Sequence, residues 1–234
     1  PVGLDFQVGP GVSDEDLAAV REGTAIVARY LAATLGGDRT GPAVARIRVG
    51  TGTEEHCCFA GPGGFDIITS NHFWTTPSAP SPETWPASTE RRELAAHEYV
   101  HVWQYEVGGG GCMRGPARWL AEGMAEWVAY HSLIEAGLIT ETQLETFIGR
   151  QLRSGRYVPL WDLLRAWPFD VKPYAVGYLA VDRLVESSGP LALRDWCERV
   201  GAGEEWTAAF ESAFGEPVED FYVRFEAYRS NYAR

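Results

Sequence analysis

The pattern of apolar and polar positions predicts short strands near the start of the chain. The segment AVARIRV at residues 43–49 alternates apolar and polar side chains from its third residue onward, as a half-buried strand does. FDIIT at residues 65–69 is a second strand candidate, preceded by the turn-rich segment 61–64. Residues 13–35 instead predict a helix, with Ser13 suited to the N-cap.

From Glu90 onward the pattern is almost wholly helical. The first predicted helix runs to about Glu106 and stops at the glycines of residues 108–111. The second opens at Pro116, a residue suited to a first helical turn, and continues to about His131. A third predicted helix starts at the capping box of Thr140 and Gln143. Later helices are predicted at about residues 159–166, 174–187, 190–200, 203–213 and 217–230.

The order of these elements predicts the fold class. Strands in the first part of the chain followed by helices indicate an α+β protein. A length of 234 residues suffices for one well-buried domain or for two small lobes that share a cleft. Residues 75–88 hold four prolines among Ser and Thr, which predicts a long surface loop. We interpret it as a loop within one domain, because it joins two segments that both contribute to the candidate site.

The charge balance argues against some classes of partner. The net charge is −12 and the isoelectric point is near 4.9. Nucleic acids and anionic membrane surfaces both favour a positive protein face, so neither is an expected partner. No apolar run approaches the roughly 18–20 residues that span a bilayer. The surplus of carboxylates is ordinary for solubility, and a cationic substrate is the alternative interpretation.

The cysteines favour an exported protein. The chain begins at Pro1 without a methionine or a signal peptide, so we expect a processed product, and four cysteines fit one or two disulfides. Buried free thiols in a cytosolic protein are the alternative. No CxxC pair is present, which leaves zinc-ribbon and thioredoxin interpretations without support. We expect no bridge between adjacent Cys57 and Cys58, because it would strain the intervening peptide, and we expect Cys112 to pair with one of them.

The string His97-Glu98-Tyr99-Val100-His101 is an HExxH sequence in the first long helix. Positions i and i+4 lie on one face of a helix, so both imidazoles can reach a single zinc ion. Glu98 then flanks a water molecule bound to the metal. The alternative is a buried histidine pair without a metal, and the apolar positions around Leu94 and Trp103 favour the metal site over it.

A catalytic zinc site needs a third protein ligand and an open position for water. Glu122 lies 21 positions after His101, enough for a glycine turn and a return helix. No histidine occurs in residues 102–111, which excludes a metzincin arrangement. His131 would be a ligand only if the second helix ran in the opposite direction. His56 and His72 lie in loop-like segments and are expected at the surface or at the rim of a cleft. His72 could line that cleft.

The string WLAEGMAE at residues 119–126 resembles the gluzincin metallopeptidases, whose second helix carries a ligand glutamate in WLxEGxAE strings, as in the aminopeptidase-N-like and peptidase MA-like families. The resemblance implies Glu122 as the third zinc ligand. It also implies that Glu126, one turn later, holds His97 through its other ring nitrogen. The implied fold is one zincin-like catalytic domain, with an N-terminal α/β lobe at residues 1–111 and a mainly helical lobe at residues 112–234.

The segment PYAVGY at residues 173–178 resembles the PYxxG string of the same families. The resemblance implies that the Tyr174 hydroxyl donates to the tetrahedral intermediate, with Tyr178 as the second candidate. The GxMEN motif, which holds a substrate's amino terminus in the aminopeptidase branch, is absent, and this favours cleavage within a chain. Zincin edge strands pair with extended peptides, so we expect that role for residues 65–69.

These residues together predict a zinc-dependent metallopeptidase acting on a peptide or protein substrate. Glu98 is the expected general base, and His97, His101 and Glu122 are the expected zinc ligands. Two other functions are consistent with the same residues. One is hydrolysis of a non-peptide amide or ester, and the other is a gluzincin-like module that binds zinc without catalysis.

Overall fold

The structure is a computed structural model that describes residues 3–37, 41–53, 56–75, 85–114, 117–163 and 168–232. It is an α+β protein with a four-stranded mixed sheet in its N-terminal part and mainly helices after it, which confirms the predicted fold class. Contacts divide the chain into two compact units. We call Pro1–Glu106 with Val128–Leu144 the sheet unit, and Val107–Trp127 with Glu145–Arg234 the helical unit.

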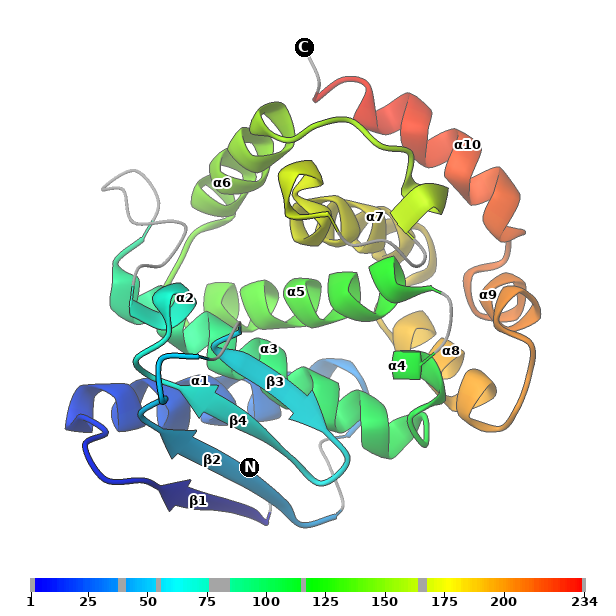
Figure 1. Cartoon of the computed structure of the whole chain (residues 1–234). Coiled ribbons are helices and arrows are strands. Elements are labelled where there is room, and N and C mark those ends of the chain that lie inside the picture. Colours follow the sequence, from blue (N-terminus) through cyan, green and yellow to red (C-terminus); the bar gives the residue numbers. More distant parts are fainter. Residues whose placement is uncertain are drawn as a thin grey trace. The chain divides into compact units, whose positions relative to one another are not determined.

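The sheet has the strand order β1-β2-β4-β3 (Figure 1). Its strands are β1 (Leu4–Val8), β2 (Ala43–Arg48), β3 (Cys58–Gly61) and β4 (Gly64–Ile68). β1 and β4 both run parallel to β2, whereas β3 forms an antiparallel hairpin with β4. The sequence predicted β2 and β4 but neither β1 nor β3. β4 is as short as β1, so its run of apolar residues after a glycine turn, and not its length, made it recognisable.

The position of β4 corrects one expectation. β4 lies between β2 and β3, so both of its backbone edges are occupied by neighbouring strands. The strand expected to pair with a substrate is therefore an interior strand, and β3 is the edge strand on that side of the sheet. Sequence periodicity shows which residues extend as strands but does not determine their order in a sheet.

Two long helices pack together in the sheet unit. They are α1 (Asp14–Thr34) and α3 (Ala87–Val107), and Figure 1 shows both behind the strands. The predicted cap of α1 is confirmed, because the Ser13 hydroxyl accepts a hydrogen bond from the Asp16 amide at 3.1 Å. A Cβ atom at Gly23 would clash with the Arg92 carbonyl, so this glycine permits close contact of the helix backbones. The short helix α2 (His72–Thr75) buries Trp74, whose indole donates to Asp16.

The remaining helices agree with most of the sequence prediction. They are α4 (Gly111–Arg114), α5 (Arg118–Glu135), α6 (Glu141–Ser154), α7 (Pro173–Ser188), α8 (Leu191–Gly201), α9 (Trp206–Phe214) and α10 (Val218–Arg229), with 3-10 turns η1 (Leu160–Leu163) and η2 (Phe169–Val171). The helix predicted at residues 159–166 is only the short turn η1 as far as the described residues extend. Pro116 and residues 76–84 of the predicted loop lie outside the described residues. No described helix is long and apolar enough to cross a membrane.

An aromatic cluster holds the start of α5 within the helical unit. The Trp119 side chain is fully buried and stacks on Phe221, with ring centroids 5.8 Å apart. Its indole nitrogen donates to the Tyr222 hydroxyl at 3.3 Å, and its ring also meets the edge of Phe210. Since aromatic pairs contribute beyond their buried area, these contacts anchor the helix that carries Glu122.

The cysteine pairing differs from both expectations. Cys112 on α4 lies at disulfide distance from Cys197 on α8, with Cα atoms 5.0 Å apart. The close approach of these helices explains the pairing, because a Cβ at Gly111 would lie 2.9 Å from the Val200 carbonyl oxygen. Cys57 and Cys58 lie at disulfide distance from each other. The expected link from Cys112 to one of them is wrong, since the packing of α4 on α8 is not visible in sequence spacing.

Candidate metal centre

Helix α3 brings the two histidines of the HExxH sequence together. The Nε2 atoms of His97 and His101 lie 2.9 Å apart, and the rings meet edge to face at a centroid distance of 4.6 Å. Both side chains are buried, with 6% and 5% of their surface exposed. The helical period alone produces this convergence, because residues four apart are neighbours on one helix face.

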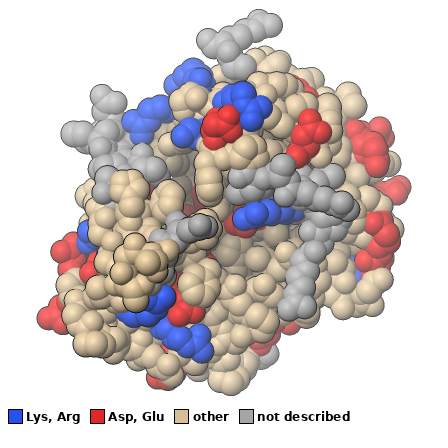
Figure 2. All heavy atoms as spheres, in the orientation of Figure 1, with Lys and Arg blue, Asp and Glu red and all other residues tan. Residues whose placement is uncertain are grey.

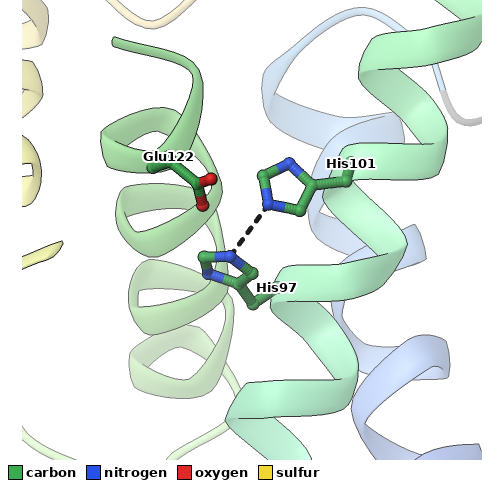
Figure 3. A group of neighbouring side chains, drawn as sticks. All are labelled: His97, His101 and Glu122. Atoms are coloured by element: carbon green, nitrogen blue, oxygen red, sulfur yellow. Dashed lines mark hydrogen bonds between the residues drawn. The ribbon is translucent and has the colours of Figure 1, made fainter. Parts of the chain in front are cut away.

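Glu122 on α5 completes a candidate metal-binding group with the two histidines. One ligand atom from each of the three residues lies within 4.8 Å of the other two. Figure 3 shows the Glu122 carboxylate directed toward both imidazole rings. Two imidazole nitrogens and one carboxylate oxygen are the donor set that zinc takes in catalytic sites, so the donor chemistry fits a zinc ion.

A second candidate group also includes His97. Ligand atoms of Glu93, His97 and Glu126 are also within 4.8 Å of one another, and all three residues are buried. The expected proximity of Glu126 to His97 is therefore present. Glu93 was not anticipated from the sequence, although its position four residues before His97 on α3 was a usable signal.

The other ring nitrogen of His101 also has a protein contact. Its Nδ1 lies 2.7 Å from Oε1 of Gln104, a fully buried side chain. If Nδ1 carries the proton and donates it to the amide oxygen, Nε2 keeps its lone pair for a metal ion. Gln104 was also missed from the sequence, and its signal was the i+3 spacing from His101.

Glu98 and Tyr174 lie on the two helices expected for them. Glu98 is buried in α3, with 7% of its surface exposed. Tyr174 is half-buried in the first turn of α7, directly after Pro173 at the helix start. The second candidate, Tyr178, is buried one turn later, with 7% of its surface exposed.

The remaining histidines lie outside both groups. His56 and His72 are exposed, as expected for surface residues. His131 is part of α5 and is partly exposed. None of the three belongs to a metal-binding group among the described residues.

Arg118 contacts a candidate metal ligand. The Arg118 Nε donates to Oε1 of Glu122 at 3.3 Å, across one turn of α5. The arginine side chain is 46% exposed and the glutamate side chain is 12% exposed. On the face drawn in Figure 2, acidic and basic side chains are interspersed among uncharged ones.

Comparisons with known proteins do not extend these observations. No protein-family model matches this chain, and no curated protein matches it as a relative. The candidate metal centre therefore rests on its residues and their arrangement.

Proposed function

We propose that this chain is a zinc-dependent metallopeptidase of the gluzincin type that cleaves within peptide chains. The observation that carries the proposal is the convergence of His97, His101 and Glu122, with ligand atoms within 4.8 Å of one another. Three protein ligands of this kind leave a coordination position for a water molecule. The HExxH spacing, which places Glu98 beside that position, distinguishes this arrangement from a closed structural site.

A zinc ion held by these residues would polarise the scissile carbonyl and make a water molecule more acidic. Glu98 accepts a proton from the water and later delivers it to the leaving amine. Tyr174 donates a hydrogen bond to the carbonyl oxygen as that oxygen gains negative charge. Glu126 lies near His97 and Gln104 contacts His101, so these two side chains would orient the rings of the proposed ligands.

An oxidising compartment fits the same proposal. Two cysteine pairs lie at disulfide distance, and such pairs are typical of exported proteins. We therefore propose an exported hydrolase whose substrate is a peptide or protein met outside the cytoplasm.

The test compares zinc-loaded wild type with Glu98→Gln on a panel of unfolded proteins, with and without a chelator. We expect wild type to cleave chain-internal bonds in a chelator-sensitive manner. Glu98→Gln should keep its zinc but lose activity, because the amide cannot accept the proton. Glu211→Gln, an exposed change on α9, serves as the matched control.

Each alternative has its own outcome in this experiment. Zinc binding without cleavage of any protein would reject the peptidase and favour either a non-peptide hydrolase or a binding module. Activity on a panel of amide and ester compounds then separates those two. Full activity of Glu98→Gln would reject Glu98 as the base.

A further inference from the structure

We infer that Arg118 binds a carboxylate group of the substrate close to the scissile bond and so determines specificity. The inference rests on the proposed function and adds the chemical class of the substrate. Its starting point is the 3.3 Å contact between the Arg118 guanidinium and Glu122, a proposed zinc ligand.

The contact fixes where the positive charge lies. Arg118 precedes Glu122 by one helical turn, a rise of about 5.4 Å. A guanidinium has five N–H donors and keeps its charge at all physiological pH values. Its Nε donates the hydrogen bond to Glu122. Glu122 has two carboxylate oxygens, so contact with Arg118 through Oε1 is compatible with a metal ion at the other oxygen. Glu122 thereby holds the guanidinium beside the metal position.

The surrounding charges make this cation decisive for substrate choice. Four glutamates on α3 and α5 are buried in or next to the two metal-binding groups: Glu93, Glu98, Glu122 and Glu126. When ionised, these four carboxylates carry more negative charge than the two positive charges of a zinc ion offset, so they disfavour a negatively charged substrate. Arg118 supplies a positive group with a side chain that is 46% exposed and can meet a ligand from solvent. Guanidinium and carboxylate form paired, charge-assisted hydrogen bonds, so this ligand class suits Arg118 best.

The distance from the metal position limits where the carboxylate lies in the substrate. An extended peptide advances about 3.3 Å per residue. A carboxylate that reaches Arg118 therefore belongs to a residue within about two positions of the bond that is cut. It is either an Asp or Glu side chain or the free carboxyl terminus of a short substrate.

The test measures binding, so that it does not depend on turnover. Two pairs of peptide hydroxamates are titrated into zinc-loaded protein by calorimetry. One pair carries Glu or Gln next to the hydroxamate, and the other ends in a free or an amidated carboxyl group. Arg118→Met removes the charge and Arg118→Lys keeps it. The control is Arg194→Met, because Arg194 forms a similar i,i+4 pair with Glu198 on α8.

We expect wild type and Arg194→Met to bind the acid of one pair about tenfold more tightly than its neutral partner. Arg118→Met should bind both partners about equally with unchanged zinc content, and Arg118→Lys should keep part of the preference. The pair that shows the preference identifies a side chain or a terminus as the source of the carboxylate.

Three results would overturn the inference. Wild type without any preference, or with a preference for neutral or cationic peptides, rejects Arg118 as a carboxylate site while the metal centre stands. An undiminished preference in Arg118→Met does the same. Wild type that binds no zinc rejects the proposed function itself, and this inference with it.

Discussion

Gly123 on α5 and Gly177 on α7 lie in direct backbone contact. The Cα atom of Gly123 lies 3.1 Å from the position of a Cβ atom at Gly177, and a Cβ at Gly123 would clash with the Gly177 carbonyl. Gly123 follows Glu122, and Gly177 lies one turn after Tyr174. The contact therefore sets the position of the helix carrying Tyr174 relative to the proposed zinc ligand. Gly123 lies in the WLAEGMAE string and Gly177 lies in the PYAVGY string, the two segments that resemble gluzincin sequences.

Replacement of either glycine by alanine tests this contact. In an isolated helix, Gly→Ala stabilises by up to about 1 kcal/mol. For Gly123→Ala and Gly177→Ala we expect instead a loss of about 1–3 kcal/mol in the free energy of unfolding, because the helices must separate. Urea denaturation measures the change. Gly149→Ala on α6 is the control, since its nearest neighbour is the flexible end of Arg153, and a stabilising effect at all three sites would contradict the close contact.

Removal of the Glu122 carboxylate should abolish tight zinc binding. Glu122→Ala leaves two ligands of the three, and we expect it to retain little zinc after dialysis, as measured by elemental analysis. Glu126→Gln should weaken zinc binding by only about 10–100-fold, because that residue acts through His97. Unchanged zinc content in Glu122→Ala would eliminate Glu122 as a ligand.

Tyr174→Phe should lower kcat by about 10²–10³-fold with little change in KM, because the hydroxyl stabilises charge that develops only in the transition state. Zinc content should stay the same. Tyr178→Phe is the matched control on the same helix face. The opposite ranking of the two variants would transfer the role to Tyr178.

The two cysteine pairs should differ in their effect on stability. Cys112 and Cys197 are separated by 85 positions, so a bridge between them restricts a long loop in the unfolded chain. We expect Cys112→Ala with Cys197→Ala to cost about 4 kcal/mol in non-reducing denaturation. A bridge between the adjacent Cys57 and Cys58 restricts no long loop, so Cys57→Ala with Cys58→Ala should cost much less stability. Equal losses from both double variants would contradict this account.

Stability should fall at alkaline pH. Burial raises the pKa of the Tyr222 phenol from 10.0 to about 12, and burial raises the pKa of Tyr30 to about 12 as well. The folded chain therefore holds these protons more tightly than the unfolded chain. The resulting stabilisation is complete below pH 10 and is lost as the pH rises toward 12, by about 1 kcal/mol per tyrosine at pH 11.

Denaturation midpoints measured between pH 8 and pH 11 test this effect. Tyr222→Phe should show a shallower decline than wild type, although it also removes the acceptor of the Trp119 indole and so starts from lower stability. An identical slope in the variant would mean that Tyr222 does not contribute.

Long helices with clear ends were predictable, whereas short strands were predictable only in part. The cap at Ser13 placed the start of α1 correctly, because capping is a local interaction. β1 and β3 were missed, and the predicted strand at residues 65–69 was given the wrong place in the sheet. Strand order depends on backbone pairing between segments that are distant in the chain, and no local pattern encodes it.

The sequence by itself determined the pair of imidazoles, because a helical period of 3.6 residues requires His97 and His101 to share a face wherever α3 lies. Only the tertiary structure decided which carboxylates join them. The approach of Glu122 to both rings, the arrival of Glu93 beside Glu126, and the pairing of Cys112 with Cys197 all depend on packing between helices that the local sequence does not specify. Local spacing determines which side chains share a face, and long-range packing determines what that face meets.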